Sequence, residues 1–370
     1  MPDSHMTDSA PSLFDPVTVG DLVLPNRILM APLTRGRATK DHVPTALMGD
    51  YYAQRAGAGL ILSEATGISK EGLGWPYAPG LWTDDQVEGW KPVVARVHAA
   101  GGRIFAQLWH MGRLVHPDMG GGPPVSSVAV AAAGQAHTYS GKQDYATPRA
   151  LPASEIPRVV GDYVTAARNA MIAGFDGVQI HAANGYLIDQ FLRDTPNDRD
   201  DDYGGSADNR VRLLREVTAA VAGEVGADRT AVRLSPNGVV QSTDDSDPVT
   251  TFTTAAKALD ALGIAFLEMR EPREASTFAK TDVAPVSPHI RKVFGAPLFL
   301  NSDYGFADGQ AQLDKGLADG IAYGRPFLAN PDLVERFRAG AELNAPNPKT
   351  FYTRGPEGYT DYPAMAAAPA

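Results

Sequence analysis

Three polar side chains that could do chemistry lie close together in the stretch HAANGYLIDQFL, residues 181–192. If the chain turns helically after residue 181, His181 and Asn184 project to one side. Each can offer an N–H donor, and two convergent donors would stabilise negative charge building on a carbonyl or nitro oxygen. The phenol of Tyr186 has a reference pKa near 10, so it keeps its proton at neutral pH and could protonate a carbanion-like carbon. The structural alternative is that His181 caps a strand and Tyr186 packs under a helix.

The elements that must position these residues form a repeating pattern. Most of the β-rich runs are continuously apolar, which is typical of strands buried on both faces of a parallel sheet. We expect strands at 27–32, 59–65, 103–110, 176–181, 230–236, 264–270, 297–302 and 320–324. Helix start and stop signals mark segments between them, at 43–57, 83–101, 153–174, 209–226 and 247–263. Eight β–α units in series predict a single α/β domain, a (β/α)8 TIM barrel. A doubly wound sheet is the rival, but no G-x-G-x-x-G follows an early strand.

Two segments fall outside the eightfold pattern. Residues 11–26 are expected to form an N-terminal hairpin with a turn at Gly20-Asp21, which could plug the lower end of the barrel. Residues 111–152, after the third strand, are too many for a plain βα loop and are expected to form a long capping loop or lid. We assign the barrel to residues 11–365, a disordered leader or cloning remnant to 1–10, and a tail to 366–370.

Catalytic groups of such barrels cluster at the C-terminal ends of the strands. His181 ends the fourth strand, which explains why a buried strand leads into polar residues. The polar or aromatic residues at the strand ends are Thr34, Glu64, Gln107, Trp109, His110, His181, Asn184, Arg233, Glu268, Arg270, Asn301, Asp303 and Arg325.

Composition excludes several classes of protein. The net charge is −10, which argues against nucleic acid as a partner and requires local positive charge for any anionic ligand. There is no cysteine, so disulfides, thiolate catalysis and cysteine-bound metals are excluded. No apolar run approaches the length of a membrane span, and residues 1–12 lack the layout of a signal peptide. We expect a cytoplasmic protein that binds neither membranes nor nucleic acid and needs no metal.

A family resemblance adds to these inferences. The stretch FDGVQIHAANGYLIDQFLRDTPNDRDDDYGGSADNR, residues 175–210, resembles the signature of the old yellow enzyme family. These enzymes are FMN-dependent ene-reductases of the NADPH dehydrogenase and N-ethylmaleimide reductase type, built on a (β/α)8 barrel. The likeness runs from about Leu13 to Met365. It includes LPNRILMAPLTR (24–35), GLILSEAT (59–66), FAQLWHMGR (105–113), AYGRPFLANPDL (322–333) and EGYTDYP (357–363).

The resemblance implies tightly bound FMN. Flavin contacts are implied at Pro32, Thr34, Ala65 and Gln107, and Arg233 would lie beside N1 and O2, where reduced flavin carries negative charge. An ion pair at the barrel mouth is the alternative role for Arg233.

The phosphate of FMN would be held by Ser302, Asp303, Gly324 and Arg325, with Arg325 as a two-pronged anion clamp. The family often has glycine at the first two of these positions. The carboxylate of Asp303 cannot coordinate phosphate at neutral pH, so we expect it to point away, towards the ribityl chain or Arg325.

The resemblance also implies a substrate site above the flavin. His181 and Asn184 would bind the activating oxygen of the substrate, and Tyr186 would donate the proton. Trp75, Trp109 and Tyr352 would shape the pocket, with core packing as the alternative for each. NADPH or NADH would dock at the same place and reduce the flavin, which predicts ping-pong kinetics.

The predicted function is the reduction of activated C=C bonds in small electron-poor alkenes: enones, enals, maleimides and nitroalkenes. Alternatives are reduction of nitroesters or nitroaromatics, another FMN-barrel oxidoreductase of the dihydroorotate or 2-hydroxy-acid type, and a non-catalytic flavin- or steroid-binding protein. A metal hydrolase is disfavoured because no H-x-H follows the first strand. The oligomeric state, monomer or dimer, stays open.

Overall fold

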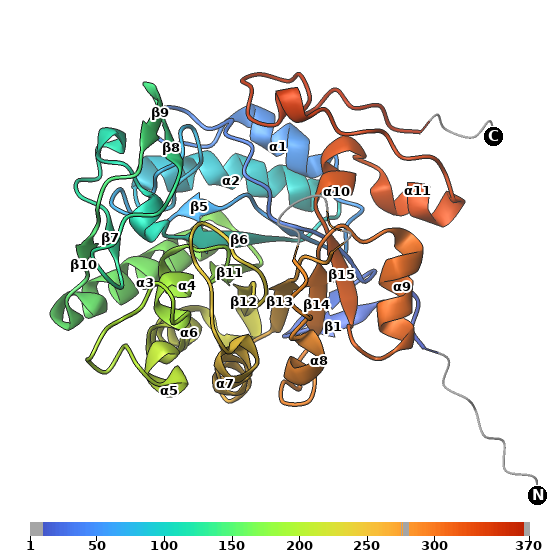
Figure 1. Ribbon diagram of the computed structural model, residues 1–370. Coiled ribbons are helices and arrows are strands. Elements are labelled where there is room, and N and C mark those ends of the chain that lie inside the picture. Colours follow the sequence, from blue (N-terminus) through green and yellow to red (C-terminus); the bar gives the residue numbers. More distant parts are fainter. Residues whose placement is uncertain (1–9, 275, 277–280, 366–370) are drawn as a thin grey trace, which may run out of the picture.

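The centre of the molecule is a closed barrel of eight parallel strands (Figure 1). The computed structural model describes residues 10–274, 276 and 281–365. The barrel strands are β3 (Ile28–Met30), β4 (Leu60–Leu62), β6 (Ile104–Trp109), β11 (Gly177–His181), β12 (Thr230–Leu234), β13 (Phe266–Arg270), β14 (Leu298–Asn301) and β15 (Gly320–Tyr323). Pairing of β15 with β3 and of β11 with β6 closes the ring. The predicted fold class is therefore confirmed, and every predicted strand is present.

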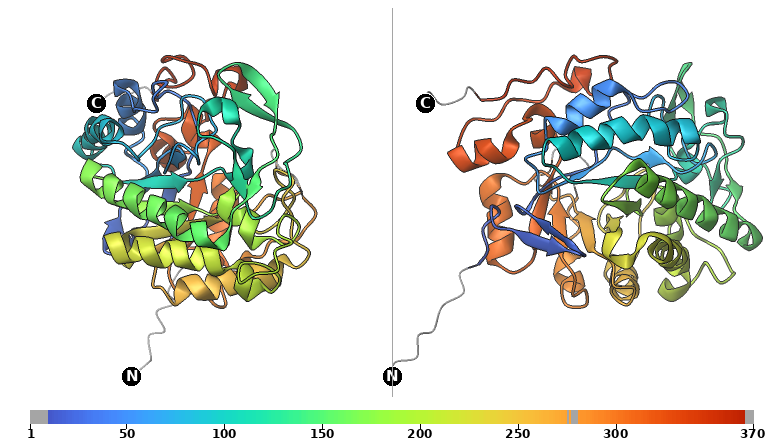
Figure 2. Two further views of the ribbon diagram at one scale, coloured as in Figure 1. Left: turned by 90° about the vertical axis from the view of Figure 1, so that its left-hand side faces the viewer. Right: turned by 180° about the vertical axis from the view of Figure 1, so that it is seen from behind.

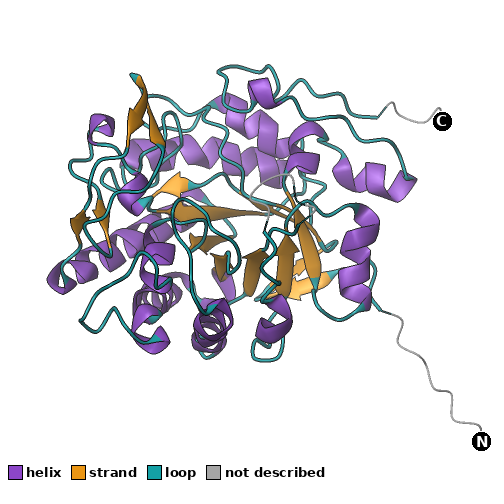
Figure 3. Cartoon of the chain, in the orientation of Figure 1, coloured by secondary structure: helices purple, strands orange, loops and turns teal. Residues whose placement is uncertain are grey.

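Helices surround the barrel and return the chain to the start of the next strand (Figure 3). They are α1 (Ala46–Ala53), α2 (Asp84–Ala99), α3 (Ile156–Ala173), α4 (Leu187–Leu192), α5 (Ala207–Arg210), α6 (Arg212–Val225), α7 (Pro248–Asp260), α8 (Ser287–Ile290), α9 (Phe306–Asp314), α10 (Arg325–Ala329) and α11 (Leu333–Ala339). The helix start signal at residue 247 is confirmed, because the Asp247 side chain accepts a hydrogen bond from the backbone N–H of Thr250 (3.1 Å) at the start of α7. No helix in the described ranges has the length and apolar character needed to cross a membrane.

The interior of the barrel changes from apolar to polar along the strands. Near their N-terminal ends, Phe105, Phe266 and Phe299 belong to one buried apolar cluster. Side chains two residues apart on a strand face the same side, so the next inward positions form a second level. That level is polar, and we call it the polar layer: Gln107, Gln179, Arg233, Glu268 and Asn301. One step further along come the residues at the mouth of the barrel.

The predicted N-terminal hairpin closes the lower end of the barrel. Strands β1 (Val17–Val19) and β2 (Leu22–Leu24) pair antiparallel, and Figure 2 shows the hairpin beside the barrel strands in the view from behind. Val17, Val19 and Leu24 join the apolar cluster of the barrel interior. Gly20 has φ +55°, and a Cβ there would lie 1.8 Å from the carbonyl oxygen of Asp228, so only glycine fits this turn.

The long segment after β6 is folded. It contains η1 (Gly112–Leu114), η2 (Pro117–Met119), a parallel pair of β7 (Val125–Ser126) with β10 (Arg149–Ala150), and a hairpin of β8 (Gln135–Thr138) and β9 (Gly141–Asp144). Buried Arg113 ties it to the loop after β12 by donating to the carbonyl of Ser242 (2.7 Å) and the hydroxyl of Thr243 (3.1 Å). The remaining elements are β5 (Thr66–Gly67), η3 (Ala153–Glu155), η4 (Ala227–Arg229) and η5 (Pro348–Thr350). Residues 1–9 of the predicted leader at 1–10, and the predicted tail at 366–370, lie outside the described residues.

Candidate active site

A cavity of about 560 Å³ opens at the C-terminal ends of the barrel strands. This volume lies in the ordinary range for small-molecule and cofactor sites. The predicted residues that line it are Pro32, Thr34, Trp75, Trp109, Asn184, Tyr186, Arg233, Ser302, Asp303, Gly324, Arg325 and Tyr352. His181, Ala65 and Gln107 do not line it and are almost fully buried. Residues 111–152 do not line it either, although Ala132 and Tyr145 pack in the cluster that contains Trp75 and Tyr186.

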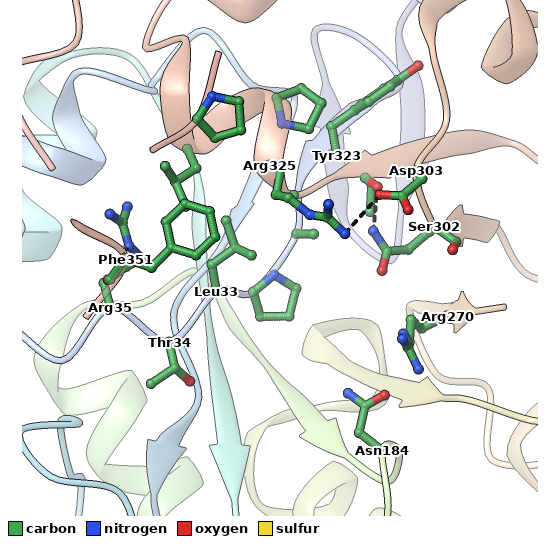
Figure 4. Close-up of a pocket in the computed structure, with 18 of the residues that line it drawn as sticks. Leu33, Thr34, Arg35, Asn184, Arg270, Ser302, Asp303, Tyr323, Arg325 and Phe351 are labelled. Atoms are coloured by element: carbon green, nitrogen blue, oxygen red, sulfur yellow. Dashed lines mark hydrogen bonds and ion pairs between the residues drawn. The ribbon is translucent and has the colours of Figure 1, made fainter. Parts of the chain in front are cut away.

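The turn that carries the polar trio is not helical, so the helical arrangement considered for His181 and Asn184 is not the one that the chain adopts. β11 ends at His181 and α4 begins only at Leu187. Between them Asn184 and Gly185 adopt left-handed backbone, with φ +58° and +76°. Asparagine tolerates this region better than most residues, but at Gly185 a Cβ would lie 2.7 Å from the Cβ of Gln241. The stretch N-G is therefore a tight turn, and it aims Asn184 into the cavity (Figure 4).

Buried polar contacts hold this turn in place. The backbone N–H of Asn184 donates to the hydroxyl of Ser235 (2.7 Å), and that of Gly185 donates to the Asp189 carboxylate (2.8 Å). Asp189 forms an ion pair with Arg193 (3.1 Å), and both side chains are fully buried. Arg193 also donates to the backbone carbonyl of Ser235. The ends of β11 and β12 are thus locked together beneath the trio.

His181 is in a state suited to hydrogen-bond donation. Its Nδ1 accepts the backbone N–H of Ala183 (3.3 Å), which leaves the ring proton on Nε2. Burial, and secondarily the charge of Arg233, hold the pKa of His181 well below its usual value. The ring is therefore neutral near pH 7. Asn184 is half-buried in the cavity wall, and its Oδ1 has no hydrogen-bond partner in the described part of the chain.

Tyr186 packs against both aromatic neighbours by its ring edges. Its ring centroid lies 4.8 Å from that of His181 and 4.9 Å from that of Trp109, each with an interplanar angle of 87°. Burial raises the pKa of the Tyr186 phenol above its usual value, and Tyr145 and Tyr352 add to this effect. The hydroxyl keeps its proton throughout the neutral range.

Arg233 lines the cavity and also forms an ion pair. It lines the cavity, yet only 6% of it is exposed. Its Nε lies 3.2 Å from the Oε1 of Glu268, and its Nη2 donates to the Oδ1 of Asn301 (2.8 Å). Gln107 belongs to the same polar layer, where its Nε2 donates to the Oε1 of Gln179 (2.7 Å).

The loops after β14 and β15 meet at the opposite side of the cavity. Asp303 has φ +39°, and its Oδ1 lies 3.2 Å from the Nη2 of Arg325 (Figure 4). The carboxylate therefore points towards Arg325, one of the two directions we expected. Asn301 links the two strands by donating to the carbonyl of Ala322 (2.7 Å), and the hydroxyl of Ser302 lies 3.1 Å from that of Ser276.

Several cavity residues were not assigned a role from the sequence. Arg270 ends β13 and lines the cavity; in Figure 4 it lies between Asn184 and Ser302. Burial, followed by the charge of Arg233, lowers its pKa to about 10. The alternation of side chains along β13 could have identified it, because Arg270 is the next inward-facing residue after Phe266 and Glu268. Phe351 also lines the cavity, from the C-terminal segment, and no local pattern marks it.

Two buried arginines bind that C-terminal segment to the barrel. Arg35 donates to the carbonyls of Phe351 (3.1 Å) and Gly358 (2.6 Å), and Arg37 donates to those of Phe351 (2.7 Å) and Thr350 (3.0 Å). The aromatic wall containing Tyr352 is therefore fixed from the loop after the first barrel strand.

Comparisons with known proteins agree with this geometry. Residues 12–344 match the model of the NADH:flavin oxidoreductase / NADH oxidase family. The chain is 42% identical to 12-oxophytodienoate reductase 1 of Oryza sativa subsp. japonica, covering 95% of this chain and 93% of that protein. It is 40% identical to 12-oxophytodienoate reductase 2 of Arabidopsis thaliana, covering 95% and 96%.

Solved structures show the same likeness. The old yellow enzyme homologue from Zymomonas mobilis is 60% identical, with a TM-score of 0.95 over 96% of this chain and 100% of that one. Morphinone reductase is 45% identical, with a TM-score of 0.93 over 97% and 98%. The chain therefore belongs to the NADH:flavin oxidoreductase / NADH oxidase family and is an FMN-dependent NAD(P)H oxidoreductase of the old yellow enzyme type, which reduces activated C=C bonds.

Proposed function

We propose that the cavity at the barrel mouth is the place where this reduction occurs, and that its residues divide into a cofactor side and a substrate side. FMN, when bound, takes hydride from NAD(P)H and gives it to the β-carbon of the alkene. The chain supplies everything else: it holds the cofactor, orients the substrate and provides the proton. The observation that carries the proposal is the convergence of Asn184, Tyr186 and Arg233 on one cavity.

The residues present fit FMN. Arg233 is a buried cation suited to negative charge on the pyrimidine side of a reduced flavin, and Arg325 is a cation suited to the phosphate. Pro32 and Thr34 line the same cavity, and Gly324 leaves room for close backbone approach. Gln107 and Ala65 are buried beneath the cavity, so we assign them to the floor of the cofactor site.

The substrate oxygen is held by two neutral donors. Nε2–H of His181 and the amide of Asn184 would donate to the carbonyl or nitro oxygen and withdraw electrons from the double bond. Because His181 is neutral, it polarises without transferring its proton. Trp75, Trp109 and Tyr352 limit the shape of the alkenes that enter.

Tyr186 is the proton donor to the α-carbon. A phenol with a raised pKa is a weak acid, but the developing carbanion is a far stronger base, so the proton moves only when hydride arrives. The same property prevents loss of the proton to solvent between turnovers.

The test is a visible spectrum followed by anaerobic titration. The purified protein should be yellow, bleach on addition of NADPH, and regain its colour on addition of 2-cyclohexenone. If the yellow colour returns with a 2-keto acid, the oxidation product of a 2-hydroxy acid, and not with the enone, another FMN-barrel reaction is favoured. A colourless preparation that cannot be reconstituted with FMN would refute the proposal.

We further propose that residues 11–365 act as one domain in the cytoplasm that binds neither nucleic acid nor membranes, as a monomer or a dimer. The absence of cysteine is compatible with that compartment. Light scattering after size-exclusion chromatography would decide between monomer and dimer.

A further inference from the structure

The polar layer beneath the cavity contains a carboxylate whose role the proposed mechanism does not use. Glu268 is fully buried on β13, one inward position below Arg270. Its Oε1 lies 3.2 Å from the Nε of Arg233, and its Oε2 accepts a hydrogen bond from the Nε2 of Gln179 (2.8 Å). A buried carboxylate is costly unless it is paired, so its position beside the cavity cation calls for a functional explanation.

We propose that Glu268 is an ionised positioning residue that orients Arg233 and partly neutralises it, and thereby keeps the reduction potential of the bound cofactor low. This inference rests on the proposed function, because it takes FMN to lie beside Arg233.

The contacts of Glu268 indicate that it is ionised. Its Oε2 accepts a hydrogen bond from the amide of Gln179, and its Oε1 lies 3.2 Å from the Nε of Arg233 in a charge contact that is not a hydrogen bond. The guanidinium of Arg233, 3.2 Å away, favours the charged form of the carboxyl. Burial raises the pKa of Glu268, while Arg233 and the hydrogen bond from Gln179 oppose that rise.

The pairing weakens the positive charge that the cavity feels from Arg233. Arg233 is held on one side by Glu268 and on the other by the amide oxygen of Asn301 (2.8 Å). In a buried site the effective dielectric constant is about 20 rather than 80, so a carboxylate at this distance cancels much of the field of the guanidinium. A cofactor that gains negative charge on reduction is then stabilised less in its reduced form, which makes it a stronger hydride donor to alkenes.

Glu268 also fixes the direction of a chain of hydrogen bonds. Because Gln179 donates its amide N–H to Glu268, its carbonyl oxygen is left to accept from the Nε2 of Gln107 (2.7 Å). Gln107 is thereby left with its own carbonyl oxygen as an acceptor. One buried charge thus sets the hydrogen-bonding character of the cavity floor across three strands, β6, β11 and β13.

The test is the reduction potential of the holoenzyme, measured by anaerobic equilibration with a redox dye. Glu268→Gln keeps the shape and removes the charge. We expect the equilibrium between oxidised and reduced flavin to move at least about tenfold towards the reduced form, a rise of about 30 mV for a two-electron couple. Glu268→Asp, which keeps the charge, should restore most of the wild-type potential.

A matched control is Glu271→Gln. Glu271 comes directly after the end of β13 and, like Glu268, is buried, being only 3% exposed. Its Oε1 accepts hydrogen bonds from the backbone N–H groups of Val286 (2.6 Å) and Ser287 (3.0 Å). Its loss should change thermal stability and leave the potential within about twofold of the wild-type equilibrium. Equal shifts in Glu268→Gln and Glu271→Gln would overturn the inference, as would no shift in Glu268→Gln.

A second variant keeps the inference falsifiable if Glu268→Gln does not fold. Asn301→Asp adds a carboxylate on the other side of Arg233, so the potential should fall. A yellow Asn301→Asp protein with an unchanged or raised potential would overturn the role of Glu268 while leaving the proposed function intact. A wild-type protein that never binds flavin would overturn both.

Discussion

Replacing Tyr186 by phenylalanine separates proton delivery from every other role of the cavity. The change removes one hydroxyl and keeps the ring, whose edge contacts with His181 (4.8 Å) and Trp109 (4.9 Å) involve no oxygen. No hydrogen bond of the hydroxyl to another described residue is lost. We therefore expect the free energy of unfolding to change by less than about 0.5 kcal/mol, as for substitutions that break no network.

The effect on chemistry should be much larger. A positioned general acid accelerates its step by roughly 10²- to 10⁴-fold. At 1.36 kcal/mol per factor of ten, its loss should raise the activation free energy of that step by about 2.7–5.4 kcal/mol. Only the half-reaction in which the alkene is protonated should lose this factor. Because burial raises the pKa of Tyr186, the wild-type rate of that half-reaction should not fall between pH 6 and 9 through loss of the phenol proton.

The assay is anaerobic stopped-flow with the two half-reactions measured separately, flavin reduction by NADPH and reoxidation by 2-cyclohexenone. Tyr145→Phe is the matched control, because Tyr145 packs in the same cluster but does not line the cavity. It should leave both rates within about twofold of wild type. Equal losses in the two half-reactions of Tyr186→Phe, or none in reoxidation, would remove Tyr186 from the role of proton donor.

Three further outcomes follow from the geometry. The double variant His181→Ala, Asn184→Ala should lose the charge-transfer band that phenols give with oxidised flavin; a surviving band would place the oxygen site elsewhere. Gly185→Ala should lower the free energy of unfolding in urea by about 1–3 kcal/mol, because its φ is positive and its Cβ would collide with Gln241. Burial lowers the pKa of His110 to about 3, so the unfolded chain binds its proton first as pH falls below 6.5. The free energy of unfolding should therefore not depend on His110 above that pH, and below it should fall by up to about 1.4 kcal/mol per pH unit. His110→Asn should reduce this pH dependence. An unchanged dependence in the variant would contradict the assignment.

The sequence by itself determined the barrel. Continuously apolar runs separated by capped helices can bury both faces only in a parallel sheet, and eight of them close on themselves. The sequence also located the strand ends, so Asn184, Tyr186 and Arg233 could be expected at one mouth before any contact was known. The hairpin at 11–26 was predictable for the same reason, since Gly20-Asp21 is a local turn signal.

Other features depended on residues far apart in the sequence. The left-handed turn at Asn184 is held partly by a distant residue, because its backbone N–H donates to Ser235 on the next strand end, and this contact could not be read from the local sequence. The wall at Phe351 and Tyr352 is held by Arg35 and Arg37, more than 300 residues earlier.

Only the tertiary structure decided which charges neutralise one another. From the sequence, Arg233 was either a cofactor contact or an ion pair; the structure shows that it lines the cavity and forms an ion pair, because Glu268 is its register partner on β13. Strand periodicity tells which residues face inward, but the stagger of the closed barrel decides which inward side chains meet. That pairing sets the local field, and a local field cannot be read from the order of residues along the chain.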